Sequence, residues 1–501
     1  MNNGKICVAV CAETADEMIE NIKRAEEFAD VIEVRFDCLR PEQIEDLSAK
    51  IERSIFAKLL LATFRSPEQG GKSAATIDER TAFWQRPWTR FWAADVEEDV
   101  FDVSPGWNNR IVSYHDFDNI PTDLESIYNR LISHDADITK IAVQTDDITD
   151  AIPVWKLIEK AKAAGKEVIP IAMGEAGKWT RILGLAHGAF MTYTSLDAGK
   201  ETAEGQITVK EMINVYRVRE LDENTQVFGV IGDPISQSVS PYMHNPAFAA
   251  AGINAVFIPL LVKNLDEFMR RMVVSETREV ELNFCGFSVT MPHKQAIMKY
   301  LDAIDPTAEK IGAVNTVKIE DGKLTGYNTD AHGFITPLKT RFGSLQNASV
   351  AVFGAGGAAR ACVYALTQEG ADVTVFARDH EKGKAFANEF DVNFEKLPTA
   401  NCQLPTATDI VVNATPLGMK GPYENETLFT SDELSGVKFV YDLVTRPDDT
   451  PLINEAKKAG IPVIGGVEML IAQGARQFEI WTGRAADIET MRDSLISRMQ
   501  V

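Results

Sequence analysis

The first part of the chain alternates short apolar runs with amphipathic segments. Eight of the runs are strand-like: residues 5–11, 31–37, 58–64, 91–97, 110–116, 138–144, 167–173 and 188–194. Between them lie segments with the helical spacing of apolar residues, such as 15–29 and 151–165. This alternation predicts a parallel sheet with helical crossovers. Eight repeats favour a closed (β/α)8 barrel of the TIM type over an open doubly wound sheet.

Further α/β units follow the predicted barrel. The chain has 501 residues, which is too long for a single core. The polar stretch 216–226 has the composition of a short linker, and a new strand-like run begins directly after it. We therefore expect a barrel over 1–217 and two α/β domains over 226–335 and 336–470. Helices over 471–501 are expected to pack back on the middle domain.

Composition narrows the classes of function. The formal net charge of −22 argues against nucleic-acid or anionic-membrane binding, so an anionic substrate would need locally placed Arg or Lys. The six cysteines contain no CxxC pair, which indicates neither a zinc site nor a disulfide framework and favours a reducing cytoplasm. The chain opens almost directly into a strand, which leaves no room for a leader peptide, and its apolar runs are too short to span a bilayer. No metal and no protein partner are expected.

Polar side chains gather at the ends of the barrel strands, where barrel enzymes do their chemistry. These residues are Glu33, Arg35, Arg65, His115 and Lys140. A lysine in an apolar run can act as a nucleophile where burial or nearby cations lower its pKa. His115 ends the strand before that of Lys140 and is placed to shuttle protons. With Arg181, three arginines around one lysine suit an anionic, polyhydroxylated substrate.

The motifs EVRFD, TFRSPEQGG, VSYHDF, ADITKIA, MGEAGKWTRIL and EGQ resemble type I 3-dehydroquinate dehydratase across residues 1–217. The resemblance implies that Lys140 forms a Schiff base with the substrate ketone and that His115 is the general acid and base. It also implies substrate contacts at Glu33, Arg35, Arg65, Arg181, Gln206 and, as a serine equivalent, Thr202. Arg181 would hold the carboxylate, while Met173 and Tyr193 line the pocket. Gln69 in place of a common Glu and the long 197–206 lid depart from the family pattern.

A second constellation begins with GAGGAA, where Gly354, Gly356 and Ala359 have the spacing of a dinucleotide-binding turn between a strand and a helix. Arg378 ends the next predicted strand, where an NAD-specific site usually carries an acid. Arginine there favours NADP, and Lys382 can assist it. Asp379 follows immediately, so the preference between the two cofactors stays open.

Upstream of the glycine-rich turn, polar residues recur in short motifs. Ser238 and Ser240 lie on alternate positions near a helix start, where they are either ligands or solvent-facing N-cap residues. Lys294 and Asp330 can form a proton-donating pair in a cleft or a surface salt bridge.

The motifs SVS, VTMPHK, AVNT, NTD, GAGGAAR, NATPLGM, DTPL and GGVEMLIAQGA resemble shikimate dehydrogenase over residues 226–501. The resemblance implies a Rossmann-type NADP domain and a catalytic pair, Lys294 and Asp330. It implies substrate contacts at Ser238, Ser240, Thr290, Asn315, Asp330 and Gln473. It implies cofactor contacts at Gly354, Ala355, Gly356, Gly357, Ala358, Arg378, Lys382, Asn413, Thr415, Gly466 and Met469. Thr445 stands where the family carries a tyrosine.

Three functions fit these motifs. The first is a bifunctional enzyme that dehydrates 3-dehydroquinate and then reduces 3-dehydroshikimate to shikimate with NADPH. The second is an enzyme whose reductase half uses quinate or another hydroxy acid. The third is a quinate-responsive regulator built on decayed copies of both domains, which should lack the catalytic lysines. Because Lys140, His115, Lys294 and Asp330 are all present, we expect the bifunctional enzyme.

Overall fold

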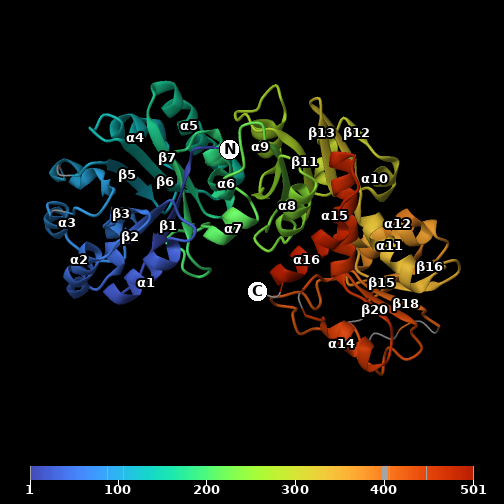
Figure 1. Cartoon of the computed structure of the whole chain (residues 1–501). Helices are drawn as coiled ribbons and strands as arrows, with labels where there is room; N and C mark the ends of the chain where they lie inside the picture. The colour runs from blue at the N-terminus through green and yellow to red at the C-terminus, as the bar shows by residue number, and fades with distance from the viewer. Residues whose placement is uncertain are drawn as a thin grey trace. The chain divides into compact units, whose positions relative to one another are not determined.

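A computed structural model describes residues 2–86, 88–104, 107–397, 404, 407–446 and 448–499. The chain separates into two compact units (Figure 1). The first comprises residues 1–227, 234–236 and 254–283, and the second comprises the rest. The domain boundaries expected from the sequence stay predictions.

An eight-stranded parallel barrel forms the first unit, as the repeat pattern predicts. Its strands are β1 (Lys5–Val10), β2 (Val31–Arg35), β3 (Leu59–Thr63), β4 (Ala93–Glu97), β5 (Arg110–Asp116), β6 (Ile138–Gln144), β7 (Glu167–Met173) and β8 (Met191–Ser195). From β1 to β7 each strand pairs with the next along the chain, and β8 pairs with β1 but not with β7. The remaining gap is bridged where the N–H of Phe190 donates to the carbonyl of Val168 at 2.9 Å.

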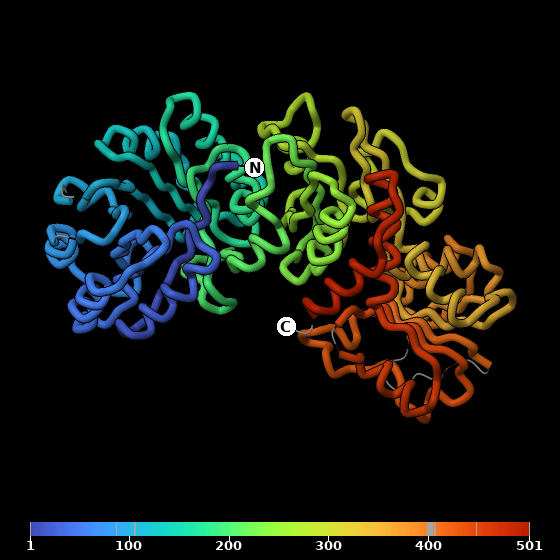
Figure 2. Tube along the Cα trace, in the orientation of Figure 1, coloured from blue at the N-terminus to red at the C-terminus, as the bar shows by residue number. Residues whose placement is uncertain are grey.

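Helices follow the barrel strands and supply the crossovers, as the trace in Figure 2 shows. They are α1 (Ala15–Ala25), α2 (Ile44–Arg53), α3 (Ile77–Trp84), α4 (Leu124–Leu131), α5 (Ile152–Ala164), α6 (Lys178–His187) and α7 (Val209–Asn214). In α1, Thr14 caps the first turn, and Met18 and Ile22 on one face are buried. Apolar side chains such as Leu61 and Ile169 fill the barrel interior. The polar chemistry is therefore confined to one end.

The stretch predicted as a polar linker is docked on the barrel instead. Val218 and Leu221 are buried, and the Asn2 side chain donates to both of their carbonyls. Arg219 forms an ion pair with Asp30 at 2.7 Å. Charged residues outnumber the buried apolar residues of this stretch, such as Val218 and Leu221. Composition alone therefore indicated a linker.

A six-stranded mixed sheet follows, in the order β10-β9-β11-β13-β14-β12. Its strands are β9 (Gln226–Gly232), β10 (Ala255–Leu261), β11 (Phe284–Val289), β12 (Ala303–Ile304), β13 (Thr316–Glu320) and β14 (Lys323–Tyr327). The short helices between them are α8 (Pro241–Ala250), α9 (Leu265–Phe268) and α10 (Pro306–Ile311). β13 runs antiparallel to both β11 and β14.

A parallel Rossmann-type sheet completes the second unit, in the order β17-β16-β15-β18-β19-β20. Its strands are β15 (Ser349–Phe353), β16 (Asp372–Ala377), β17 (Asn393–Lys396), β18 (Ile410–Asn413), β19 (Phe439–Asp442) and β20 (Val463–Ile464). The helices around it are α11 (Asp330–Phe342), α12 (Gly357–Gln368), α13 (His380–Phe390) and α14 (Pro451–Lys458). Strand order reverses beside β15, and sheets of this kind bind nucleotides at that point.

The chain ends in two helices, α15 (Gly466–Thr482) and α16 (Ile488–Met499), which lie beside the mixed sheet (Figure 1). Nε1 of Trp481 donates to the carbonyl of Val317 in β13 at 3.0 Å. The guanidinium of Arg498 lies 4.6 Å from the ring centre of Tyr242 in α8. These contacts bring the end of the chain back to residues more than 160 positions earlier.

The cysteines correct one expectation. Cys11 and Cys38 form a disulfide, although their spacing indicates no bridge. They follow β1 and β2, and these neighbouring parallel strands bring together residues 27 positions apart. Cys7, Cys285 and Cys362 form no disulfide among the described residues, and Cys402 lies outside these residues. The cytoplasmic location inferred from the cysteine pattern stays a prediction.

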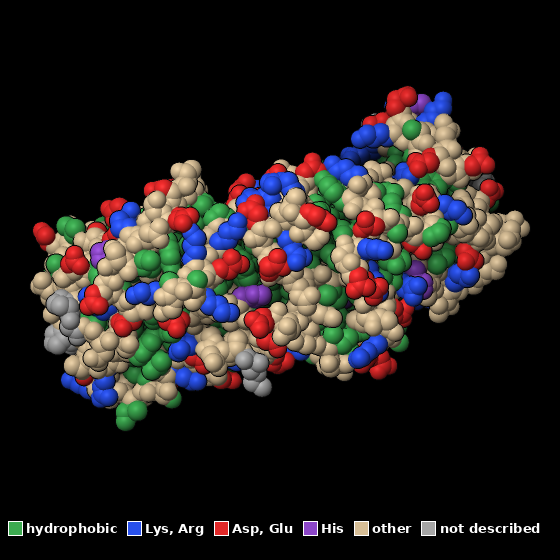
Figure 3. Space-filling model, turned by 90° about the horizontal axis from the view of Figure 1, so that it is seen from above, with side chains coloured by type: hydrophobic (Ala, Val, Ile, Leu, Met, Phe, Trp, Pro, Cys, Tyr) green, Lys and Arg blue, Asp and Glu red, His purple; other side chains and the backbone are tan. Residues whose placement is uncertain are grey.

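No helix among the described residues is long and apolar enough to cross a membrane. In the same part of the chain, no cluster of three His, Cys, Asp or Glu side chains is placed to hold a metal ion. Acidic and basic side chains are interspersed on the face shown in Figure 3.

Candidate active sites

A cavity of about 400 Å³ opens at the carboxyl ends of the barrel strands. It brings together every barrel residue that the sequence predicts for the site, although they come from five strands, a helix and two loops. The predicted residues that line it are Glu33, Arg35, Arg65, His115, Lys140, Met173, Arg181, Tyr193, Thr202 and Gln206. Gln69, Phe117, Ala142, Ile171 and Ala203 complete the wall.

Lys140 is the lysine among the residues that line this cavity, and only 4% of its side chain is exposed. Its Nζ lies 2.6 Å from Oδ2 of Asp95 and 3.7 Å from Oε1 of Glu33. The ring centre of Tyr193 lies 4.0 Å from the same nitrogen. Two carboxylates and an aromatic face therefore surround the ammonium, which compensates for its loss of water.

Buried acids neutralise two of the three predicted arginines. Arg35 makes a bidentate pair with Asp37, with both bonds at 2.8 Å. Arg65 reaches Oδ2 of Asp95 at 2.9 Å and Oε1 of Glu97 at 3.3 Å. Arg35 and Arg65 therefore already have acidic partners, and their substrate contacts stay predictions.

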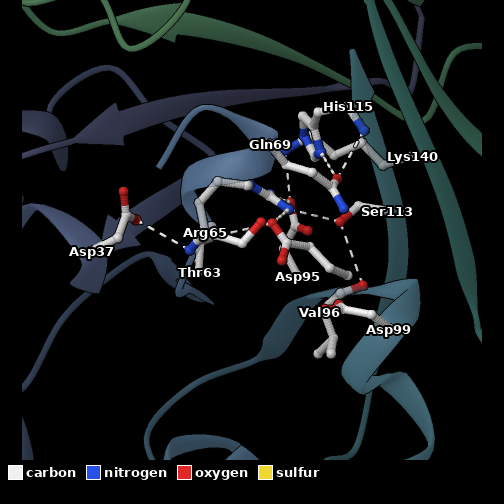
Figure 4. A network of polar contacts seen from close by, with 12 residues as sticks. Asp37, Thr63, Arg65, Gln69, Asp95, Val96, Asp99, Ser113, His115 and Lys140 are labelled. Carbon is white, nitrogen blue, oxygen red and sulfur yellow. Dashed lines mark hydrogen bonds and ion pairs between the residues drawn. The ribbon is translucent and has the colours of Figure 1, made fainter. Parts of the chain in front are cut away.

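Asp95 joins the two cations of the site. Figure 4 shows Arg65, Asp95 and Ser113 meeting at the centre of a polar network, with Lys140 and His115 beside them. Burial alone would raise the pKa of Asp95, but Arg65 and Lys140 hold that pKa well below its usual range. Sequence reasoning missed Asp95 and Glu97. The signal was present, since both lie on alternate positions of an apolar strand that ends at the same edge as Arg65.

His115 is neutral in this setting. Burial, with the cations Arg65 and Lys140 nearby, lowers the pKa of His115 well below its usual value. In the strand register, His115 lies opposite Ala142, and Lys140 lies opposite Ser113. The two residues therefore lie two positions apart in the register of adjacent strands, on the same face of the sheet. Both side chains line the cavity.

Arg181 differs from the other two arginines. It lies in the first turn of α6 and is 2% exposed. Its Nη2 donates weakly to the carbonyl of Glu204 at 3.5 Å, and its Nε and Nη1 have no partner among the described residues. Burial lowers the pKa of Arg181 to about 10, so the guanidinium stays charged at neutral pH. An unpaired cation at a cavity wall is suited to hold a substrate carboxylate.

The long lid forms part of the cavity wall. Nε2 of Gln206 donates to Oγ1 of Thr202 at 3.0 Å, and the N–H of Thr202 donates to Oε1 of Gln206 at 2.8 Å. The lid is tied to the barrel where the N–H of Gly174 donates to the carbonyl of Glu204 at 3.1 Å. Thr202 thus lines the cavity, and its role as the serine equivalent stays a prediction.

In the second unit, Lys294 and Asp330 form a close pair, with Nζ 2.5 Å from Oδ2. Their side chains are 20% and 9% exposed, so the pair is not an ordinary surface salt bridge. The other oxygen of Asp330 accepts from Nδ2 of Asn315 at 2.8 Å. Oε1 of Gln473 lies 3.5 Å from the same nitrogen. Four predicted residues thus form one connected group.

The two predicted serines precede α8 and are partly exposed. The N–H of Ser240 donates to Oγ of Ser238 at 3.4 Å, and the Ser240 hydroxyl makes no capping bond to the helix. Ser240 therefore occupies the N-cap position of α8 without capping through its side chain, and its role as a ligand stays a prediction. Thr290 follows β11, and its N–H donates to the carbonyl of Ile231 in β9 at 3.0 Å. This places Thr290 at the end of β9 that leads into the serine loop.

The glycine-rich turn fits a dinucleotide. Gly354 has φ +118°, and a Cβ there would lie 2.6 Å from the carbonyl oxygen of Ala414. A Cβ on Gly356 would meet nothing within 4 Å, and no side chain caps α12 at this residue. Exposed backbone N–H groups at a helix N-terminus attract a pyrophosphate. A Cβ on Gly357 would lie 3.4 Å from Cδ of Lys294, so this turn adjoins the Lys294–Asp330 pair.

Asp379 is engaged elsewhere. Its carboxylate accepts from the N–H of Lys382 at 3.1 Å and caps α13. Arg378 and Lys382 are exposed, and no ion pair involves either of them within the described residues. Near the end of β16, Arg378 and Lys382 are therefore two cations without acidic partners in the described part of the chain, which suits a 2′-phosphate.

The Asn413 side chain is held within the protein. Its Nδ2 donates to Oδ1 of Asp442 at 2.9 Å, and its Oδ1 accepts from the N–H of Thr415 at 3.0 Å. Burial raises the pKa of Asp442 to about 6. Asn413 therefore shapes the 413–418 loop, and sequence reasoning missed its buried partner Asp442.

Gly466 and Met469 lie in the first turn of α15, and Met469 is buried. A Cβ on Gly466 would come 2.5 Å from the carbonyl oxygen of Leu443, so this helix approaches the end of β19 closely. Thr445 lies exposed just beyond that strand.

Comparison with known proteins now adds to the geometry. The family model of type I 3-dehydroquinase matches residues 6–223. Three further models match the second unit. They are the shikimate dehydrogenase substrate-binding domain over 230–317, shikimate/quinate 5-dehydrogenase over 337–420 and the shikimate 5′-dehydrogenase C-terminal domain over 466–496.

The chloroplastic bifunctional 3-dehydroquinate dehydratase/shikimate dehydrogenase of Arabidopsis thaliana is 34% identical over 97% of this chain and 83% of its own length. The NADP(+) shikimate dehydrogenase of Methanocaldococcus jannaschii is 39% identical over 56% of this chain and 99% of its own. A solved structure of shikimate dehydrogenase in complex with NADP+ matches with a TM-score of 0.51 and 38% identity. That match covers 56% of this chain and 97% of the other. The chain therefore belongs to the family of bifunctional 3-dehydroquinate dehydratase/shikimate dehydrogenases, with NADP as the cofactor of its second half.

Proposed function

We propose that Lys140 attacks the ketone of 3-dehydroquinate and forms a Schiff base. His115 then removes the proton from the adjacent carbon and later protonates the departing hydroxyl, so that 3-dehydroshikimate is released after hydrolysis. One observation carries this proposal: Lys140, a neutral His115 and the unpaired Arg181 line the same cavity. Electrons from the broken C–H bond move toward the iminium nitrogen, so the imine is the electron sink.

Arg181 binds the substrate carboxylate in this scheme, because its Nε and Nη1 are buried without partners. Glu33, Arg35, Arg65, Thr202 and Gln206 contact the hydroxyl groups or hold the residues that do. Met173 and Tyr193 form the apolar part of the wall.

In the second half, Lys294 donates a proton to the carbonyl oxygen of 3-dehydroshikimate while Asp330 stabilises the ammonium. Their 2.5 Å contact and their link to Asn315 support this role. Ser238, Ser240, Thr290, Asn315 and Gln473 bind the hydroxyl groups and carboxylate.

Bound NADPH supplies the hydride. Residues Gly354, Ala355, Gly356, Gly357 and Ala358 hold the pyrophosphate, and Arg378 with Lys382 hold the 2′-phosphate. Asn413, Thr415, Gly466 and Met469 shape the rest of the cofactor site.

Borohydride trapping tests the first half. Reduction in the presence of 3-dehydroquinate should add substrate mass covalently to the protein, and Lys140→Ala should abolish both trapping and dehydration while sparing ketone reduction. Lys294→Ala is the matched variant in the other half and should retain trapping. Trapping that persists in Lys140→Ala would overturn the Schiff-base assignment.

Quinate is the competing substrate for the second half. Comparison of kcat/KM for shikimate and for quinate in the oxidative direction decides between them. The bifunctional proposal predicts a clear preference for shikimate.

A further inference from the structure

We propose that Asp95 is the counter-ion of the Lys140 iminium, a catalytic residue that pairs with the nitrogen before and after the Schiff base forms. This inference rests on the proposed Schiff-base function. Its geometric basis is the 2.6 Å contact between Oδ2 of Asp95 and Nζ of Lys140. The other carboxylate near this nitrogen, Glu33, is 3.7 Å away.

The amine attacks in its neutral form, but the nitrogen is positively charged before the attack, as an ammonium, and after loss of water, as an iminium. An ammonium and a ketone combine to give an iminium and water, and the two protons lost from nitrogen leave with the carbonyl oxygen. The nitrogen therefore carries one positive charge at the start and one at the end. A single fixed carboxylate matches both states, and the iminium retains one N–H with which to donate to it.

The surroundings hold Asp95 in its ionised form and in place. Its side chain is fully buried, and Arg65 binds the same oxygen, Oδ2, at 2.9 Å. Arg65 is in turn held by Glu97 at 3.3 Å and by Ser113 at 2.9 Å. Asp95 therefore keeps a cationic partner when Lys140 moves toward the substrate.

The second carboxylate oxygen of Asp95, Oδ1, can accept a further hydrogen bond. Oδ1 is buried and has no hydrogen-bond partner among the described residues. A buried carboxylate oxygen without a partner is costly, so a donor supplied by the bound substrate would be favourable. The hydroxyl of the carbinolamine, the adduct that precedes the iminium, is a donor of this kind.

Other charged or titratable groups also act on the Lys140 nitrogen. They come from strands around the barrel: Cys7 on β1, Glu33 on β2, Arg65 just after β3, His115 on β5 and Tyr193 on β8. Arg65, which shares Oδ2 of Asp95 with Lys140, is neutralised by two acids. Removing the charge of Asp95 would leave Arg65 and Lys140 facing each other with less compensation. The iminium should then lose its proton at a lower pH.

Absorption spectroscopy tests the proposal. The imine that Lys140 forms with 3-dehydroshikimate is conjugated, and its protonated form absorbs at longer wavelength than its neutral form. A pH titration of this band gives the pKa of the iminium. In Asp95→Asn that pKa should fall by about two units, and in Glu33→Gln by about half as much or less, because charge–charge shifts decrease with distance.

The outcomes are separable. No long-wavelength band and no borohydride trapping in the wild-type protein would mean that the Schiff-base proposal itself fails. A band with the same pKa in wild type and in Asp95→Asn, both with native circular dichroism, would overturn the counter-ion role.

The pKa of the iminium in the wild-type protein tests the proposal even if Asp95→Asn does not fold. The imine of 3-dehydroshikimate with butylamine in water serves as the reference. The iminium on the protein should have a pKa at least about one unit above that reference. An equal or lower value would contradict the proposal.

Discussion

Oε1 of Gln69 lies 3.1 Å from Nδ1 of His115 and accepts from the backbone N–H of the same histidine at 2.9 Å. Because the backbone N–H is a donor, the atom of Gln69 that receives it is the oxygen. Nδ1 of His115 must then carry the proton, and Nε2 is left as the basic nitrogen. Gln69, at a position where the family often carries glutamate, therefore fixes the tautomer of the proposed general base.

Gln69→Glu should move the pH profile of dehydration. A carboxylate beside the ring favours the imidazolium and raises the pKa of His115 by about one unit or more. Because His115 must be neutral to remove a proton, the acid limb of kcat/KM should shift to higher pH. Gln69→Ala is the matched variant. It should lower kcat about five- to tenfold through loss of a hydrogen bond of about 1 kcal/mol, with little shift of the limb. An unchanged acid limb in Gln69→Glu would exclude this role.

Arg181→Ala should weaken substrate binding without weakening the fold. Loss of two charge-assisted hydrogen bonds, about 3 kcal/mol together, should raise KM for 3-dehydroquinate roughly 100-fold. The thermal midpoint should not fall, since the side chain is buried without an acid partner. Arg35→Ala is the contrast, because it leaves Asp37 buried and unpaired and should cost about 3–5 kcal/mol of stability. If Arg181→Ala left KM unchanged, the carboxylate would have to bind elsewhere.

Arg378→Ala should reduce the preference for NADP over NAD. The guanidinium is exposed and available for a 2′-phosphate, so the ratio of kcat/KM for the two cofactors should fall about ten- to 100-fold, as for loss of one or two charged contacts. Asp379→Ser keeps a helix cap while it removes the negative charge. It should therefore preserve the preference. A larger change in Asp379→Ser than in Arg378→Ala would contradict the assignment.

The Cys11–Cys38 bridge should stabilise the barrel. It closes a segment of 27 residues, for which chain entropy suggests about 3 kcal/mol. Reduction, or the change Cys38→Ser, should lower the urea midpoint of barrel unfolding by a corresponding amount. Mass spectrometry after alkylation of the native protein provides the direct check. Modification of both Cys11 and Cys38 without prior reduction would show that the bridge is not formed.

The sequence was most informative where a pattern repeats. Eight strand-like runs predicted the barrel, and the placement of Lys140 and His115 on consecutive strands predicted that they line one cavity. The sequence did not show which side chains form ion pairs with one another. The partners of Arg35 and Arg65 are acids that appear as ordinary strand or turn residues in the sequence. Only three-dimensional packing distinguishes these arginines from the unpaired Arg181.

Three-dimensional packing also explains two further features that the sequence did not show, the disulfide and the hydrogen bonds of Asn413. Cys11 and Cys38 are joined because β1 and β2 are neighbours, a relation that spacing in the sequence does not encode. Asn413 has the residue type expected of a cofactor ligand, but its amide is used by Asp442 and Thr415. Hydrogen-bond satisfaction is a property of the folded chain.

The central claim is that Lys140 and Lys294 perform consecutive reactions in one polypeptide. The most direct test supplies 3-dehydroquinate and NADPH to the wild type, Lys140→Ala and Lys294→Ala, and measures both products by chromatography. We predict shikimate from the wild type and accumulated 3-dehydroshikimate from Lys294→Ala. Lys140→Ala should give neither product, yet should still reduce added 3-dehydroshikimate. Shikimate formed from 3-dehydroquinate by Lys140→Ala, or none formed by the folded wild type, would contradict the account.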